Sequence, residues 1–389
     1  MTGDQSVGWV QEALRVHEEA EQERKGSPQP LPGTVREELV LERIDRARRS
    51  RPRVKEERIT MAHGAGGKAT QTLIEAIFLD ELRNPLLEPL EDAARLQISG
   101  ARLALTTDSY VVAPLFFPGG DIGDLAVNGT VNDLATSGAV PMFLSAGFIL
   151  EEGFPVADLT RIVRSMRAAA EAAGVKVVTG DTKVVQKGKA DGCYINTAGV
   201  GAIEHDLDLG VAHARPGDAI IVSGPIGDHG VTIMLARGEL DIEADVVSDT
   251  APLNGLVASL LEATSGVRAL RDATRGGVAT ILNEIAKSAD VGVQVSENEI
   301  PVRDVVRGAA ELLGIDPMYV ACEGRLVAVV DGDAADHALA AMRAHPLGEQ
   351  AAIIGHVTAD PPGIVQLKTA FGGSRIVDLL VGDPLPRIC

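Results

Sequence analysis

The stretch from Pro155 to Thr179, PVADLTRIVRSMRAAAEAAGVKVVT, decides the fold class. Its apolar residues recur at helical spacing, at Leu159, Ile162, Val163, Met166 and Ala170. Gly174 then supplies a helix stop, and Val175–Thr179 predicts a strand that ends at Gly180–Lys183. A helix followed at once by a strand is typical of α/β proteins.

The same alternation extends over the chain from residue 59 onward. Further strands are predicted at Arg102–Asp108, Ala219–Ser223, Leu326–Val330 and Arg375–Val381. Further helices are predicted from Asp121, as N-cap, to Gly138, and from the segment Ala273–Gly277 to about Ala289. The sequence therefore predicts an α/β (α+β) protein.

Length, composition and charge narrow the class of protein. The 389 residues include 36 Lys and Arg against 55 Asp and Glu, a net charge of −19. So acidic a chain is expected to bind neither nucleic acid nor anionic membranes. We find no apolar run of about 18 residues, no signal peptide at Met1–Gln5 and no disulfide pattern among three cysteines. Together these features predict a cytoplasmic protein.

The distribution of charged and turn-forming residues divides the chain into four predicted segments. Residues 1–58 carry equal numbers of acidic and basic residues and are predicted to be a partly disordered extension. At about 150 residues per domain, the rest divides into 59–210 and 211–381, with the boundary near the turn Arg215–Asp218. The Pro-rich residues 382–389 are predicted to form a flexible tail that ends in Cys389.

A glycine-rich stretch at His63–Thr70, HGAGGKAT, is the first candidate binding element. Glycines let a backbone approach phosphate oxygens, and a following helix N-terminus favours an anion. The stretch is not a Walker A loop, because Ala62 replaces the first glycine and no Ser or Thr follows Lys68. A phosphate site and a simple turn into a helix both remain open on this evidence.

Aspartates at the ends of predicted elements form the second candidate. They are Asp92, Asp108, Asp133, Asp181 and Asp272. Ligands of α/β folds gather at strand ends and helix starts, and Mg²⁺ is the hard cation that carboxylates and phosphates share. Each aspartate taken alone is more often a cap or turn residue, so spacing by itself does not establish the site.

Three further residues could carry chemistry. Cys389 is the last residue, and residues 383–389 can extend roughly 23 Å, so its thiol could carry a covalent group into a cleft and out again. Cys193 and Cys322 lie in apolar contexts and are expected to be buried. Lys183 and Glu323 lie beside predicted strands, either as ordinary surface charges or, for a buried Glu323, as a general base.

The motifs together resemble the HypE family of [NiFe]-hydrogenase maturation proteins, within the AIR-synthase-like ATP-binding superfamily. They are His63–Lys68, Thr106–Ser109, Pro114–Gly123, Val131–Leu134, Gly180–Lys183, Asp272–Gly277 and Pro384–Cys389. The terminal Pro-Arg-Ile-Cys is the most specific of them. The resemblance covers about residues 59–389, and it departs from the family at Glu91, where a glycine is usual.

The resemblance implies a two-domain AIR-synthase-like fold with an extended C-terminal tail. It implies a homodimer formed by the N-terminal sheets, with ATP near the dimer interface. It also implies a carbamoyl dehydratase: a HypF-type carbamoyltransferase loads the Cys389 sulfur, and ATP drives dehydration to a thiocyanate. The cyano group would then pass to iron on the HypC–HypD scaffold.

The chemistry of the reaction that the resemblance implies leads to a hypothesis for the role of each residue. Glu323 would be the general base, and Lys183 would stabilise charge on the transferred oxygen. Mg²⁺ would be held by Asp92, Asp108, Asp133 and Asp272, with Asp181 as a fifth candidate. ATP would be bound by His63, Gly66, Gly67, Lys68, Asp108, Asn132, Asp133, Asp181, Arg275, Gly276 and Gly277. The alternatives are another ATP-dependent synthase or kinase of this superfamily acting on a free small molecule, and a non-catalytic carrier.

Overall fold

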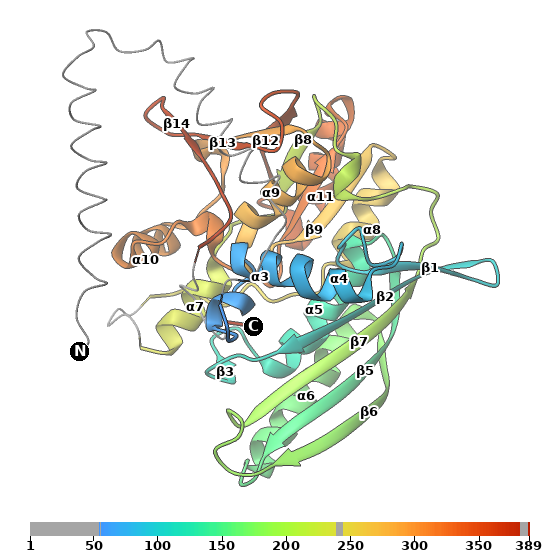
Figure 1. Cartoon of the computed structure of the whole chain (residues 1–389), viewed down its shortest axis with the longest axis vertical. Helices are drawn as coiled ribbons and strands as arrows, with labels where there is room; N and C mark the ends of the chain where they lie inside the picture. Colours follow the sequence, from blue (N-terminus) through green and yellow to red (C-terminus); the bar gives the residue numbers. More distant parts are fainter. Residues whose placement is uncertain (1–53, 55, 239–243, 382–387) are drawn as a thin grey trace, which may run out of the picture. The chain divides into compact units, whose positions relative to one another are not determined.

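The computed structural model describes residue 54 and residues 56–238, 244–381 and 388–389 (Figure 1). Residues 53–389 group into one compact unit by their contacts. Most of the predicted extension 1–58, and residues 382–387 of the predicted tail, lie outside the described residues. The four domain limits given above therefore stay predictions.

The first half of the compact unit is built on a five-stranded sheet in the order β1-β2-β7-β5-β6. Its strands are β1 Ala94–Ile98, β2 Ala101–Tyr110, β5 Val140–Glu151, β6 Lys176–Val185 and β7 Cys193–Ala202. All neighbours are antiparallel except β5 and β6. Two helices, α5 (Ile122–Thr136) and α6 (Val156–Ala173), lie on one side of this sheet (Figure 1).

The two helices confirm what their sequences predict. The Asp121 side chain caps α5 by accepting hydrogen bonds from the backbone N–H groups of Gly123 and Asp124, and the Asp124 side chain accepts one from the Asp121 N–H. Gly174 ends α6 in the left-handed conformation with φ of 72°, which costs glycine little. Both caps are formed by residues within a few positions of the helix ends, so the local sequence is enough to predict them.

Three strand predictions were wrong in length. The strand expected at Val175–Thr179 continues to Val185, because β5 pairs with it up to Glu151. Asp181 and Lys183 therefore lie inside a strand and not after its end. In the same way β2 runs two residues past Asp108, because it pairs with β7. The strand expected at Arg375–Val381 is limited to β14, Ser374–Ile376.

The second half is built on a seven-stranded sheet in the order β14-β13-β10-β12-β8-β11-β9. Its remaining strands are β8 Ala219–Val222, β9 Val267–Asp272, β10 Gly292–Ser296, β11 Leu326–Val330, β12 Ala352–Thr358 and β13 Val365–Lys368. Helix α9 (Gly277–Ser288) packs with one face of the sheet, and α8 (Asn254–Ala263) and α11 (Ala335–Ala344) pack with the other. Because both faces are covered, β11 is buried along its whole length.

Shorter elements complete the described chain. The helices are α3 Lys68–Leu73, α4 Leu79–Leu82, α7 Asp228–Ala236 and α10 Asp304–Leu313, and the two-stranded sheet is β3 Phe116–Phe117 with β4 Gly120–Asp121. The single-turn elements are Met61–Gly64, Ile74–Phe78, Val211–His213, Glu297–Glu299, Pro317–Tyr319, Gly332–Ala334 and Pro346–Gly348. Among the described residues, no helix is both long and apolar enough to cross a lipid bilayer.

Helix α5 joins the two halves through Asn132, a fully buried amide. Its Nδ2 donates to the carbonyl oxygens of Ala251, at 3.1 Å, and of Glu323, at 3.3 Å. Its Oδ1 accepts a hydrogen bond of 2.7 Å from the Leu253 N–H. Because Asn132 fixes α5 against the second half, the next residue, Asp133, is held beside the end of β9.

The crossing of α5 over α6 yields a stability prediction. A Cβ atom on Gly123 would lie 2.4 Å from the backbone oxygen of Ile162, which cannot move aside. Gly123→Ala should therefore lower the free energy of unfolding by about 1–3 kcal/mol, measured by urea denaturation. The control is Gly308→Ala, in α10, where a Cβ meets nothing within 4 Å. It should stabilise the protein by about 0.5–1 kcal/mol. Equal effects of the two substitutions would contradict this packing.

Candidate active site

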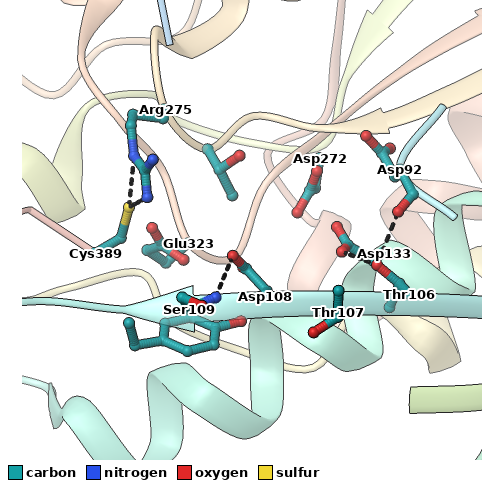
Figure 2. A pocket seen from close by; sticks show the side chains of 12 residues that line it. Asp92, Thr106, Thr107, Asp108, Ser109, Asp133, Asp272, Arg275, Glu323 and Cys389 are labelled. Carbon is teal, nitrogen blue, oxygen red and sulfur yellow. Dashed lines mark hydrogen bonds between the residues drawn. The ribbon is translucent and has the colours of Figure 1, made fainter. Parts of the chain in front are cut away.

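The candidate site is a cavity of about 240 Å³ beside the second half of β2 (Figure 2). Strand β1 starts at Ala94, which pairs with Leu105, so the edge of β2 beyond Leu105 is not covered by β1. The lining residues are Asp92, Thr106, Thr107, Asp108, Ser109, Tyr110, Asp133, Asp272, Thr274, Arg275, Glu323 and Cys389. The cavity thus joins both halves of the compact unit to the C-terminal residue.

Three predicted carboxylates meet at one end of the cavity. Oxygens of Asp92, Asp133 and Asp272 all lie within 4.8 Å of one another. Thr106 donates a hydrogen bond of 2.7 Å to Asp133, and Thr136 donates one of 3.0 Å to Asp92. Three hard oxygen donors so close together suit a divalent cation such as Mg²⁺.

Burial and nearby negative charges raise the pKa of each of these carboxyl groups. Burial raises the pKa of Asp92 to about 6, although the neighbouring Arg271 opposes the shift. The pKa values of Asp133 and Asp272 lie well above the ordinary range, first because both are buried and then because the negative charges face one another. A bound cation would remove that repulsion, which is a physical reason for the cluster to hold one.

Arg271 lies behind the cluster and was not identified from the sequence. Its guanidinium is 2.7 Å from a carboxylate oxygen of Asp92, 2.8 Å from one of Glu284 and 3.7 Å from one of Glu91. Glu91 also accepts a hydrogen bond from the backbone N–H of Val211. The unusual Glu91 therefore has structural partners of its own, and Arg271 also forms an ion pair with Asp92.

Cys389 lies at the other end of the cavity. Its Sγ is 3.3 Å from Nε and 3.2 Å from a terminal nitrogen of Arg275, and its carbonyl oxygen accepts a hydrogen bond from the Val111 N–H. Only 8% of the residue is exposed. Burial raises the pKa of the Cys389 thiol to about 12, against the opposing effect of Arg275. Inside the cavity the sulfur is therefore held as a thiol.

Glu323 lies between Cys389 and Asp108 in the view of Figure 2. It is buried, and its Oε1 has no hydrogen-bond partner among the described residues. Burial raises the pKa of Glu323 well above its ordinary value, and the charges of Asp272 and Asp108 raise it further. A buried carboxyl group with a free oxygen facing the cavity is suited to proton transfer. Asp108 lines the same cavity outside the close three-carboxylate group.

The glycine-rich loop lies beside the cavity and packs against Arg275. The Gly64 carbonyl accepts a hydrogen bond of 3.1 Å from Arg275, and a Cβ on Gly66 would lie 2.6 Å from the Arg275 oxygen. A Cβ on Gly67 would meet the Leu380 oxygen at 2.4 Å, and Lys68 donates its N–H to that oxygen. Close packing thus explains why positions 66 and 67 are both glycine.

The remaining nucleotide candidates are placed around the same loop or in the core. His63 is buried and its Nδ1 bonds to Thr60. Gly276 and Gly277 turn the chain into α9 with φ values of 82° and 60°. Asn132 has its amide engaged by backbone groups, as described above. Their roles toward ATP stay predictions.

Lys183 and Asp181 lie outside the cavity of their own chain. Both side chains are about two-thirds exposed on the edge strand β6, and they form an ion pair at 2.5 Å. The Lys183 hydrogen bond lowers the pKa of Asp181. Strands β7 and β5 separate β6 from β2, a span of about 14 Å at usual strand spacing. One chain therefore does not bring Lys183 or Asp181 to the other candidates.

Sequence reasoning also missed Thr106 as a site residue. Thr106 lies two positions before Asp108 on β2, so both point to the same face of the sheet. That alternation is a signal the sequence contained. For Arg271 the sequence contained no such signal, because a single arginine before Asp272 has no distinctive spacing.

Comparison with known proteins identifies the family. Residues 90–203 match the model of the AIR synthase related protein N-terminal domain, and residues 215–368 match that of its C-terminal domain. Carbamoyl dehydratase HypE of Azotobacter vinelandii is 56% identical over 331 residues, 85% of this chain and 97% of that protein. The chain belongs to the HypE family of carbamoyl dehydratases. The family and the two-domain AIR-synthase-like fold predicted from the motifs are thus confirmed.

Solved HypE structures have the same fold. A crystal structure of a HypE–HypF complex matches with a TM-score of 0.76 and 49% identity, covering 79% of this chain and 99% of that one. A crystal structure of hydrogenase maturation protein HypE in complex with ATP matches with a TM-score of 0.72 and 49% identity, covering 85% and 100%.

The carboxylate cluster predicts a stability that falls as pH rises. An acid whose pKa is raised by folding binds more protons in the folded state, so stability is lost as pH increases from its unfolded pKa through its folded pKa. Asp133→Asn removes one such acid while keeping an acceptor for Thr106. In a chelator, the variant should exceed the wild type in stability by about 1–3 kcal/mol at pH 8, and by less at pH 5.

Thermal unfolding at the two pH values measures this difference. Adding Mg²⁺ at pH 8 should raise the Tm of the wild type more than that of Asp133→Asn, because the variant has lost one oxygen ligand. A Mg²⁺ response of the variant equal to that of the wild type would contradict the assignment of Asp133 as a ligand.

Proposed function

We propose that this chain converts an S-carbamoyl group on Cys389 into a thiocyanate by ATP-dependent dehydration, which supplies the cyanide ligand of the [NiFe]-hydrogenase iron. One observation carries this proposal. The Cys389 thiol lies in the same cavity as the three-carboxylate cluster and the unpaired Glu323. A carbamoyl group on that sulfur would therefore share the cavity with a cation site and a base.

The residues present fit ATP with Mg²⁺. Asp92, Asp133 and Asp272 would hold the cation, with Asp108 beside them, and the positive Arg275 and the loop containing Gly66 adjoin the same space. The HypE crystal structure in complex with ATP supports nucleotide binding by this chain as well. ATP supplies a phosphoryl group that turns the carbamoyl oxygen, a poor leaving group, into phosphate.

The residues of this chain handle the sulfur and the protons. Arg275 holds Sγ at the end of the cavity, so the carbamoyl group extends from the sulfur toward Glu323. Both carbamoyl N–H protons must leave as the C–O bond breaks and the C≡N bond forms. Glu323 is the group placed to accept one of them, because its Oε1 is free of other hydrogen bonds, and the departing phosphate takes up the other. The phosphate departs with the former carbamoyl oxygen, so all atoms balance.

Two partners follow from this proposal. A HypF-type carbamoyltransferase would load Cys389, and the crystal structure of a HypE–HypF complex supports such an encounter. The HypC–HypD iron scaffold would receive the cyano group. Both steps need Cys389 outside the cavity, since it is 8% exposed within it.

A homodimer is the third proposed assembly. The face of the five-stranded sheet opposite α5 and α6 carries exposed Leu105 and Phe143, and both pair with Val200 across the strands. Ile149, further along β5 on the same face as Phe143, is exposed too and pairs with Lys183 of β6. Such a contiguous apolar surface on a sheet is typical of an interface. We propose that a second copy covers it and that Lys183 acts there, in the cavity of the other subunit.

Neither of the alternative functions makes use of the buried Cys389 thiol. An AIR-synthase-like kinase or synthase for a free small molecule does not need Cys389 in its cavity, and a pure carrier does not need the carboxylate cluster. The tail in the cavity therefore favours a reaction on the chain's own sulfur.

The base assignment predicts a single-turnover result. Glu323→Gln keeps the size of the side chain but cannot accept a proton, so dehydration should slow by about 10²–10⁴-fold. The measurement is the mass of the Cys389 peptide after carbamoylated protein meets Mg·ATP, which falls by one water in the wild type. Glu311→Gln, at an exposed position of α10, is the control and should behave as wild type. Normal water loss in Glu323→Gln would remove Glu323 as the base.

The dimer assignment predicts complementation between two inactive variants. Lys183→Ala should be inactive in dehydration because the site lacks the positively charged ammonium group of Lys183. Cys389→Ala should be inactive because no sulfur carries the carbamoyl group. In co-expressed mixed dimers, one site keeps both an intact tail and an intact Lys183 from the other subunit. The same peptide assay should then show water loss on the intact Cys389 tails. Mixed dimers that remain inactive would show that Lys183 does not act across subunits.

A further inference from the structure

We infer that His229 is the positioning residue that holds the C-terminal end inside the cavity, through a hydrogen bond from its Nε2 to the carbonyl oxygen of Ile388. The inference rests on the proposed function, because it concerns how the reacting sulfur is kept at the site. The observations behind it are the contacts of α7 with Ile388, which no catalytic step uses.

The hydrogen bonds of His229 fix its tautomer. The imidazole is fully buried, its Nε2 is 2.7 Å from the Ile388 oxygen, and its Nδ1 is 2.8 Å from the Ser248 hydroxyl. A carbonyl oxygen only accepts, so Nε2 carries the hydrogen and Nδ1 accepts from Ser248. The Ser248 oxygen in turn accepts from the Thr250 N–H. Each donor in this series of hydrogen bonds, from the Thr250 N–H through Ser248 and His229 to the Ile388 oxygen, thus has a matched acceptor.

The ring is neutral and held in place. Burial lowers the pKa of His229 to about 4, so the imidazole keeps this tautomer at neutral pH. Phe117 packs against it edge-on, with ring centroids 5.6 Å apart. A fixed neutral donor suits an uncharged backbone carbonyl, and it does not compete with Arg275 for the sulfur.

The next residue on α7 makes room for the Ile388 side chain. A Cβ on Gly230 would lie 3.1 Å from Cδ1 of Ile388 and 2.4 Å from Cγ1 of Val320. Ile388 is 3% exposed and belongs to the same hydrophobic cluster as Val320 and Ala321. Helix α7 therefore contacts the penultimate residue twice, at its carbonyl oxygen and at its side chain, while Val111 binds the Cys389 carbonyl.

These contacts set the balance between the inner and outer positions of Cys389. When the tail leaves, His229 loses its acceptor and the recess for Ile388 is uncovered, and both changes favour return. The sulfur is one residue beyond the held carbonyl, so the His229 contact places it against Arg275 and Glu323. Weakening this contact should raise the fraction of time that Cys389 spends outside.

Alkylation of Cys389 by iodoacetamide, followed by peptide mass spectrometry, measures that fraction in unmodified protein without nucleotide. Cys193 and Cys322 are fully buried and serve as internal references. Two variants separate the nitrogens: His229→Asn keeps a polar group near Nδ1 but none that reaches Ile388, whereas His229→Gln keeps a donor near Nε2. His229→Asn should label Cys389 about five- to tenfold faster than wild type, as expected for one lost hydrogen bond, and His229→Gln should remain near wild type.

Ile388→Ala gives a second test that leaves His229 intact, in case His229→Asn does not fold. It empties the recess beside Gly230 and should also speed labelling of Cys389. Equal acceleration by His229→Asn and His229→Gln, or unchanged labelling in Ile388→Ala, would overturn the inference. The labelling experiment uses neither ATP nor a carbamoyl group. It therefore tests the role of His229 separately from the proposed dehydration.

Discussion

Repulsion among three clustered carboxylates is the constraint on which the rest of the site depends. Asp92, Asp133 and Asp272 come from a loop, a helix and a strand end, and their oxygens lie within 4.8 Å of one another. Such an arrangement persists only if the surrounding fold holds each acid in place. Asn132 fixes α5, the β9 pairing with β11 fixes Asp272, and Arg271 forms an ion pair with Asp92. The fold therefore keeps three acidic side chains close together where its two halves meet, as the proposed cation site requires.

The second feature of the site is a sulfur whose chemistry depends on its position. Inside the cavity, burial raises the pKa of Cys389 to about 12 and the thiol is unreactive as a nucleophile. Outside, the same thiol would have an ordinary pKa and could receive a group from a partner. In the proposed cycle the tail is loaded outside and then returns to the cavity.

Local signals in the sequence predicted local structure, and pairing between distant strands decided the remainder. The Asp121 cap, the Gly174 stop and the bounds of β11 were predicted correctly from the sequence. Apolar runs and cap residues act within a few positions, so their effects do not depend on distant parts of the chain. The length of β6 depends on β5, some thirty residues away, so Lys183 was misplaced at a strand end. The aspartates were candidates from their positions and from family resemblance, whereas Arg271 and His229 became visible only through their contacts.

The central claim is that phosphate carries away the oxygen of a carbamoyl group held on Cys389. Loading the tail with a carbamoyl group that contains heavy oxygen, and then adding Mg·ATP, tests it most directly. Our account predicts that the heavy isotope appears in inorganic phosphate, in amounts that match the thiocyanate formed. Heavy oxygen recovered in water, with unlabelled phosphate, would contradict it.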